Sequence, residues 1–115
     1  MSVTIYHNPR CSKSRQGLQI LQDKGVEPNI VEYLKTPPDA KTLTDILAKL
    51  GMEPRDLMRK KEAEYKDNGL QDESLSKEDL IAAMVKFPKL IERPIVVSKG
   101  KVALGRPPEN ILNII

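Results

Sequence analysis

Tyr6-His7-Asn8-Pro9-Arg10-Cys11-Ser12-Lys13-Ser14-Arg15 is the stretch that decides the fold, because it joins a strand pattern to a helix pattern. Apolar and polar side chains alternate over residues 3–6 before it, as they do in a half-buried strand. Residues 17–25 after it predict a helix that ends at Gly25, since glycine is the usual residue just past a helix C-terminus. The only cysteine, Cys11, is therefore expected where a strand passes into a helix.

This position favours a thiolate at Cys11. The first N–H groups of a helix have no partner within the helix, and the helix dipole is positive at that end. Both effects stabilise an anion or a thiolate. Arg10, Lys13 and Arg15 add positive charge nearby. A lone cysteine is more often a small buried core residue, but arginine and serine neighbours argue against an apolar core, so we predict a reactive thiol.

The composition predicts one domain in a reducing compartment. The 115 residues, 30% of them charged, carry a formal net charge of +3, which suits a single core with a mild preference for anions. We find no apolar run of membrane-spanning length and no signal-peptide pattern at the N-terminus, so we expect a cytoplasmic protein with no membrane partner. A single cysteine forbids an internal disulfide. Any redox cycle at Cys11 must therefore take its second thiol from another molecule.

The middle of the chain predicts an α/β protein. Residues 28–34 have the β-branched and aromatic content of a second strand, so the chain begins as a βαβ unit with a parallel strand pair. Residues 36–90 are predicted to be mostly helical. The first of these helices is expected to have Thr36 as its cap and Pro37 at its first position, and to end at Gly51. Further helices are predicted after Pro54, at residues 62–66, and after a capping box that begins at Ser76.

The C-terminal part predicts a hairpin and a last helix. Residues 95–97 and 102–104 flank a turn that contains Gly100. Pro107 and Pro108 begin a helix whose apolar side chains should dock on the sheet, namely Ile111, Leu112 and Ile115.

The stretch from His7 to Arg15 resembles the active-site loop of the glutaredoxin-coupled arsenate reductases, a family with a thioredoxin-like fold. Glu-Arg-Pro-Ile-Val-Val at 92–97 and Gly-Arg-Pro-Pro-Glu at 105–109 match the family too, so the resemblance covers essentially the whole chain. It is closest to a short, chromosomally encoded bacterial branch. The resemblance implies a mixed four-stranded sheet flanked by helices, in one domain over residues 1–115. It also implies a helical insertion at about 36–75, before the final hairpin. Some family members have other residues at Arg10 and Ser12-Lys13, which bears on substrate choice more than on fold.

The resemblance also assigns the site. Cys11 would be the catalytic nucleophile, and Arg59, Arg93 and Arg106 would bind the substrate oxyanion. A planar guanidinium suits this task because it can hold two oxygens of a tetrahedral anion. Taken alone, Arg59 beside two lysines would be interpreted as a solvated surface arginine. Arg93 and Arg106 each adjoin a proline in a tight connection, where functional sites are common.

Four more residues are expected to support the site: His7, Ser14, Arg15 and Pro94. His7 either tunes the thiol or holds the loop by hydrogen bonds. Ser14 occupies the place of the second cysteine of a Cys-x-x-Cys pair, and its hydroxyl either donates to the thiolate or caps the helix. The resemblance implies a cis peptide bond between Arg93 and Pro94, facing the cysteine, although trans is the default for any such bond.

Spacing and composition exclude several other classes of protein. A tyrosine phosphatase needs Cys-x5-Arg, whereas Cys11 and Arg15 form Cys-x3-Arg. One cysteine and one histidine cannot make a Cys/His zinc site, and there is no glycine-rich phosphate loop. Nucleic-acid binding is disfavoured because basic and acidic residues are interspersed, and the chain has one Phe and no Trp to stack on bases.

Two functions from different classes remain. The first is a monomeric arsenate reductase with glutathione as co-substrate and glutaredoxin as partner, with no bound cofactor or metal. The second is a redox-responsive regulator of the same superfamily, of the kind that contacts RNA polymerase. Such regulators typically use a Cys-x-x-Cys switch, and serine at position 14 favours the reductase.

Overall fold

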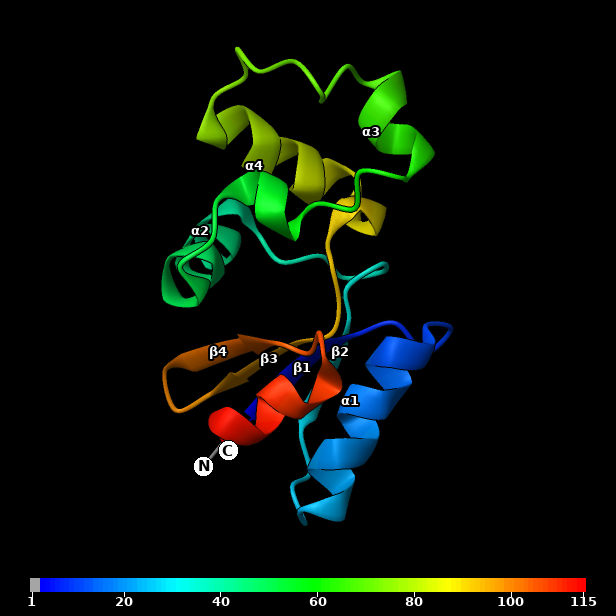
Figure 1. Cartoon of the computed structure of the whole chain (residues 1–115), viewed down its shortest axis with the longest axis vertical. Coiled ribbons are helices and arrows are strands. Elements are labelled where there is room, and N and C mark those ends of the chain that lie inside the picture. Colours follow the sequence, from blue (N-terminus) through cyan, green and yellow to red (C-terminus); the bar gives the residue numbers. More distant parts are fainter. Residues whose placement is uncertain (1–2) are drawn as a thin grey trace. The chain divides into compact units, whose positions relative to one another are not determined.

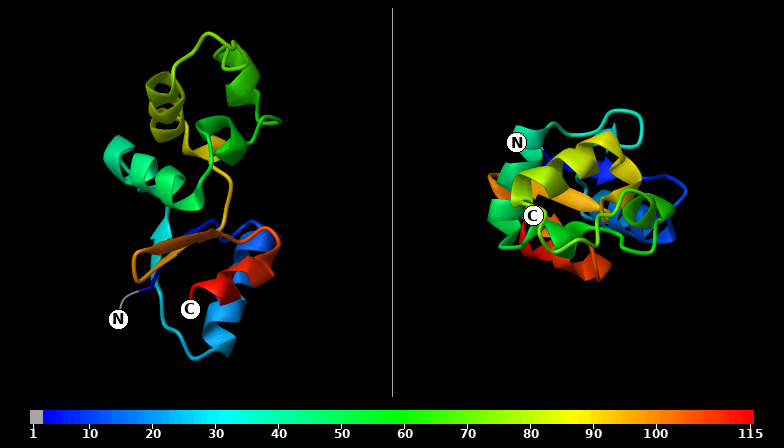
Figure 2. Two further views of the ribbon diagram at one scale, coloured as in Figure 1. Left: turned by 60° about the vertical axis from the view of Figure 1, so that its left-hand side comes forward. Right: turned by 90° about the horizontal axis from the view of Figure 1, so that it is seen from above.

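The computed structural model describes residues 3–115 and divides them into two units (Figures 1 and 2). The sheet unit comprises the residues up to Thr36 together with Arg93–Ile115, and the helical unit comprises Pro37–Glu92. The helical unit therefore extends well beyond the predicted end of the insertion at about residue 75. That the whole chain acts as a single domain stays a prediction.

A four-stranded sheet is the framework of the sheet unit (Figure 1). Its order is β2-β1-β3-β4, in which β1 and β2 are parallel and the other two pairs are antiparallel. Lys99 and Gly100, with φ of 53° and 76°, make the two-residue turn of the predicted hairpin. The mixed sheet is thus confirmed, with strands β1 (Val3–His7), β2 (Asn29–Glu32), β3 (Ile95–Ser98) and β4 (Lys101–Leu104).

Helix α1 (Ser12–Asp23) begins five residues before the predicted start, directly after Cys11. The cause is a tight turn in which the N–H of Cys11 donates to the carbonyl of Asn8, at 3.0 Å, so that the chain leaves β1 and enters the helix without a longer loop. Gly25 has a φ of +73°, which confirms the predicted end. Helix α1 and the 3₁₀ helix η3 (Pro108–Asn113) lie on the same side of the sheet in Figure 1. Between them is a core of Val3, Ile5, Leu21, Val96 and Ile111.

The prediction that Ile111, Leu112 and Ile115 all dock on the sheet was wrong for two of them. Ile111 is fully buried, but Leu112 and Ile115 are 41% and 37% exposed. The reason is the 3₁₀ geometry of η3, which has three residues per turn instead of 3.6. Its inward face therefore consists of Pro108, Ile111 and Ile114, and the other two side chains point elsewhere.

The helical unit begins with α2 (Ala40–Leu50), whose predicted start at Thr36 and Pro37 was wrong. Asp39 is the cap, and its carboxylate accepts a hydrogen bond from the N–H of Thr42 at 2.7 Å. Pro38 explains the shift, because a residue that precedes proline is kept out of the helical region, and Pro37 is such a residue.

The remaining predictions for the helical unit are confirmed. Gly51 ends α2 with a φ of 67°, and Ser76 and Asp79 form the capping box of α4. The other elements are η1 (Pro54–Leu57), α3 (Ala63–Asp67), α4 (Lys77–Lys86) and η2 (Pro88–Leu90). They enclose a core of their own, which includes Leu43, Ile46, Leu57, Leu80, Met84 and Leu90. Over residues 3–115, no helix combines the length and the apolar character needed to cross a membrane.

Gly17 lets α1 approach the sheet closely. A Cβ atom at this position would lie 2.7 Å from Cγ of Pro94 and 2.9 Å from Cδ1 of Ile111. A Cβ atom at Gly105 would meet the same two side chains, at 2.7 and 3.2 Å. The sequence signal for this packing is a glycine in the interior of a helix, where it is intrinsically unfavourable.

We predict that Gly17→Ala destabilises the protein, although alanine is the better helix former. The propensity gain is about 1 kcal/mol, whereas overpacking against a rigid proline ring costs about 1–3 kcal/mol. Urea unfolding would measure the difference, with Gln16→Ala, at an exposed position of the same helix, as the matched control. A Gly17→Ala variant more stable than wild type would contradict this packing argument.

Candidate functional site

Cys11 is the N-cap residue of α1, with φ and ψ of −97° and 125°. Its side chain is partly buried. Asn8 organises the loop before it, because the carbonyl of Asn8 accepts from the N–H of Cys11 and its side-chain Oδ1 accepts from the N–H of Arg10, both at 3.0 Å. Asn8 was not among the predicted site residues. The signal for it was an asparagine before a proline, a pair that favours the start of a turn.

The environment of Cys11 lowers the pKa of its thiol. Burial raises this pKa, but the backbone N–H of Ser14, the positive charge of Arg93, the backbone N–H of Lys13 and a hydrogen bond from Arg93 together outweigh it. The sulfur makes no capping hydrogen bond of regular geometry, so the two N–H groups act mainly as the positive end of the helix. The site therefore favours the thiolate, as the sequence predicted.

The source of the positive charge differs from the prediction. We expected the side chains of Arg10, Lys13 and Arg15 to act on the thiol, yet none of these three charges is among the causes of its lowered pKa. Arg10 and Lys13 point into solvent, where water screens their charge. Arg15 is also exposed, and its Nη1 donates to the carbonyl of Pro9 at 2.9 Å. The charge that acts is that of Arg93, which is remote in sequence and close in space.

His7 and Ser14 form a buried pair behind the loop. Nδ1 of His7 lies 2.6 Å from Oγ of Ser14, and the same Oγ accepts from the backbone N–H of Asn8 at 3.0 Å. Ser14 is completely buried and does not cap the helix. Burial lowers the pKa of His7, and Arg15 lowers it further against the opposing effect of Glu32, so the ring is neutral near pH 7. The pair fixes the end of β1 to the first turn of α1.

Arg93 and Arg106 approach each other at the ends of β3 and β4. Arg93 is 7% exposed, and Nε of Arg106 donates to the carbonyl of Arg93 at 3.1 Å. The predicted cis bond before Pro94 is present, and a second one, between Arg106 and Pro107, was not anticipated. The N–H of Gly105 donates to the carbonyl of Pro94 at 2.8 Å and ties the two segments together.

Arg59 belongs to the helical unit and is not a bare surface cation. Its guanidinium pairs with Glu62 and Glu92, at 3.4 and 3.3 Å, and its side chain is 30% exposed. That Arg59 binds the same anion as Arg93 and Arg106 stays a prediction.

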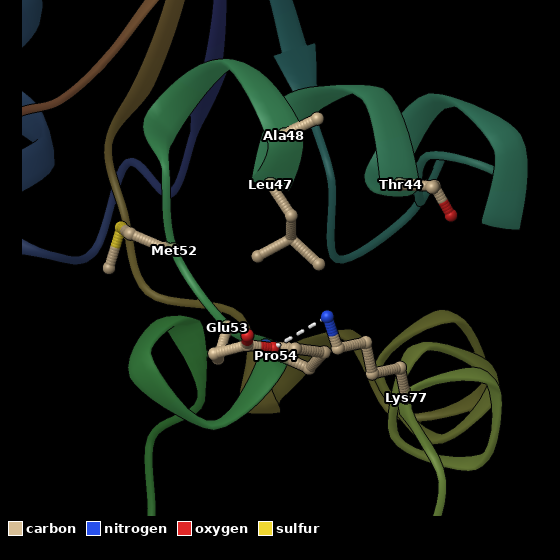
Figure 3. Close-up of a pocket in the computed structure, with 7 residues that line it drawn as sticks. All are labelled: Thr44, Leu47, Ala48, Met52, Glu53, Pro54 and Lys77. Carbon is tan, nitrogen blue, oxygen red and sulfur yellow. Dashed lines mark ion pairs between the residues drawn. The ribbon is translucent and has the colours of Figure 1, made fainter.

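Two hollows in the structure are lined by other residues. One, in the sheet unit, is lined by Lys24, Val26, Leu112 and Ile115. The other, in the helical unit, contains Leu47 and Pro54, and an ion pair of 3.1 Å between Lys77 and Glu53 spans it (Figure 3). Neither lining includes Cys11 or any of the three arginines Arg59, Arg93 and Arg106. Among residues 3–115 there is also no group of three or more His, Cys, Asp or Glu placed to hold a metal ion.

A cysteine at a helix N-terminus beside a buried arginine is a specific arrangement. Comparison with known proteins shows the family to which the chain belongs. The sequence profile of the ArsC family matches residues 6–114. The chain belongs to the ArsC family. An arsenate reductase from Neisseria meningitidis is 48% identical to it over 110 residues, 95% of this chain and 94% of that protein. The uncharacterized protein YfgD of Escherichia coli K12 is 60% identical over 114 residues, 98% of this ArsC chain and 96% of YfgD.

The solved structure of an arsenate reductase from Vibrio cholerae agrees with the fold. It superposes with a TM-score of 0.96 at 50% identity, covering 100% of this ArsC chain and 98% of the other. The predicted thioredoxin-like α/β fold is therefore confirmed.

We predict that Cys11 of this ArsC protein titrates below the value of about 8.5 that is typical of a free cysteine. The rate of alkylation by iodoacetamide, measured against pH, rises as the thiol deprotonates and gives the midpoint. Arg93→Gln should raise this midpoint because it removes a buried positive charge that lowers the pKa of the thiol, and Arg93→Lys should restore part of the shift.

Arg10→Gln is the matched control, because it removes an equal charge one residue away in the sequence. Its midpoint should equal that of the wild type. Equal effects of Arg10→Gln and Arg93→Gln would contradict the assignment of the charge to Arg93.

Proposed function

We propose that this ArsC protein is an arsenate reductase in which the thiolate of Cys11 is the nucleophile. The observation that carries the proposal is the position of Cys11 at the N-terminus of α1 beside the buried Arg93, an environment that lowers the pKa of the thiol. A thiolate attacks far better than a thiol, and a neighbouring guanidinium attracts an oxyanion to the place where attack occurs. Relatives named arsenate reductase, at 40–48% identity, support this choice of anion.

Arg93 and Arg106 would bind the arsenate oxygens from the sheet unit, and Arg59 from the helical unit. Each guanidinium can hold two oxygens without losing its charge. His7 and Ser14 would support the reaction indirectly, since their buried pair keeps the loop in place. Arg15 would do the same through the carbonyl of Pro9.

The first step would be attack by the sulfur of Cys11 on arsenic. An S–As bond forms, an oxygen of arsenate leaves as water after taking up protons, and arsenic stays in the +5 state. Glutathione then attacks the adduct. Two external thiols, one from glutathione and one from glutaredoxin, supply the two electrons that convert arsenic(V) to arsenic(III), and they become a mixed disulfide. Release of arsenite regenerates the thiolate.

The need for external thiols follows from the sequence. Cys11 is the only cysteine, and Ser14 stands where a second thiol could otherwise resolve the adduct. Ser14 is buried and bonded to His7, so it supplies no redox partner. A monomer in the reducing cytoplasm, with glutaredoxin as its protein partner, would be sufficient for turnover.

We predict arsenate-dependent turnover in an assay coupled to glutathione and glutaredoxin. Cys11→Ala should abolish the activity, and Cys11→Ser should do the same because a hydroxyl is not ionised near pH 7. Thioredoxin without glutathione should support turnover poorly. The control is Gln16→Ala, at an exposed position of α1 outside the proposed chemistry, and this variant should stay active.

Failure of wild-type protein to reduce arsenate, with Cys11 intact and reactive, would overturn the proposal. It would instead favour the regulatory alternative. Multiple turnover with thioredoxin alone would leave arsenate as the substrate but contradict the proposed source of electrons.

A further inference from the structure

Arg10 and Lys13 flank the nucleophile, yet neither activates it. Both side chains are exposed, and Arg10 directly precedes Cys11 whereas Lys13 follows it by two residues. Neither charge is among the causes of the lowered pKa of the thiol. Arg15, the third cation of the loop, differs from them because its Nη1 donates to the carbonyl of Pro9 and so helps to hold the loop.

Within residues 3–115, no acidic side chain pairs with Arg10 or Lys13. The ion pairs of this part of the chain involve other residues, and neither cation donates a hydrogen bond from its side chain. Glu32, which lies in register with His7 at the end of the neighbouring strand, pairs instead with Lys35 at 3.7 Å. The charges of Arg10 and Lys13 are therefore available to a solute.

The placement of charge in α1 is the reverse of the usual one. The helix dipole favours acidic residues in the first turn and basic residues in the last turn. Helix α1 has neither, and it carries Lys13 at its start and Asp23 at its end. The other three α-helices of residues 3–115 each have a basic residue in the last turn, namely Lys49, Lys66 and Lys86. A cation at the start of α1 does not stabilise the helix, and local rules are most often broken where function requires it.

Glutathione complements this arrangement of charge. It has a carboxylate at each end and its thiol on the middle residue, and its net charge near pH 7 is about −1. The carboxylates can meet cations on both sides of Cys11 while the thiol lies against the sulfur or its adduct. A guanidinium or ammonium in contact with a carboxylate makes a strong, charge-assisted hydrogen bond. Water screens Arg10 and Lys13 from the fixed sulfur, but it does not separate charges that are in direct contact.

We propose that Arg10 and Lys13 are specificity-determining residues that select an anionic thiol, glutathione, as the co-substrate that reaches Cys11. The proposal rests on the proposed function in taking an external thiol as the reductant. The two cations bind its carboxylates and raise the local concentration of its sulfur beside Cys11. Activation of the nucleophile and recognition of the co-substrate are thereby divided between different residues, since Arg93 lowers the pKa of the thiol.

Thiol–disulfide exchange tests this selection without arsenate. The Cys11 thiolate attacks a disulfide, a new S–S bond forms to one half of the reagent, and the other half leaves as a thiolate. The reagents are glutathione disulfide, whose halves are anionic, 2-hydroxyethyl disulfide, which is neutral, and cystamine, whose halves are cationic. Mass spectrometry follows the single adduct that the only cysteine can form. Dividing the rate of each variant by that of the wild type cancels the intrinsic reactivity of each reagent.

Arg10→Gln and Lys13→Gln should each slow exchange with glutathione disulfide by about threefold at low ionic strength. Coulomb's law gives this factor for two unit charges about 6 Å apart in water. Exchange with the neutral disulfide should keep its rate, and exchange with cystamine should become faster by a similar factor. Arg10→Lys, which keeps the charge, should retain most of the wild-type rate. Salt at about 1 M should remove most of these differences.

Lys24→Gln is the matched control, because it removes an exposed charge of the same sign from the far end of α1, about 20 Å along the helix. It should leave all three rates unchanged. Both test variants should keep the wild-type midpoint of alkylation by iodoacetamide, which checks that the loop is folded and the thiol unaltered.

Unchanged exchange with glutathione disulfide in both variants would overturn the proposal. If reduction of the glutathione adduct by glutaredoxin were slower in those variants, the two cations would belong to the interface with that protein instead. Equal changes for all three disulfides would also contradict selection by charge. Because the exchange needs no arsenate, charge-dependent exchange in a protein without reductase activity would contradict only the proposed function.

Discussion

The unpaired N–H groups in the first turn of α1 are the constraint on which the site depends. Every helix must satisfy these donors or leave them to solvent or a ligand. Most helices use a Ser, Thr, Asp or Asn side chain for this purpose, but α1 has a cysteine as its N-cap, whose sulfur is a weak acceptor until it ionises. The helix therefore gains a capping partner when the thiol loses its proton. Local structure and reactivity at Cys11 are consequences of the same backbone geometry.

The packing of the sheet unit supplies the second requirement, a cation at the right place. Gly17 and Gly105 both leave room for the ring of Pro94, so α1, the start of β3 and the end of β4 can meet without intervening side chains. Arg93, next to that proline, is thereby buried beside the cysteine. An exposed arginine at the same distance would be screened by water. The two glycines thus contribute to the electrostatics of the site through the packing that they allow.

Much of the sheet unit could be predicted from sequence, because β1 alternates with period two, Gly25 follows the end of α1, and Gly100 marks the turn between β3 and β4. The errors arose where local rules compete. The start of α2 moved because Pro38 restricts the residue before it, and the inward face of η3 differs because its period is three. The site was harder to predict, because sequence neighbours such as Arg10 proved to be solvated, whereas the charge that lowers the pKa of the thiol comes from Arg93, far away along the chain. Only the tertiary fold, which the family resemblance supplied, brings these two segments together.

The central claim is the proposal that Cys11 forms a covalent bond to arsenic beside the guanidinium of Arg93. X-ray diffraction at the arsenic absorption edge, from crystals soaked in arsenate and glutathione, tests this claim most directly. The account predicts an anomalous peak at bonding distance from Sγ of Cys11, with the guanidinium of Arg93 against the arsenic-bound oxygens. Arsenic at another position in fully soaked crystals, with an unmodified Cys11, would contradict it.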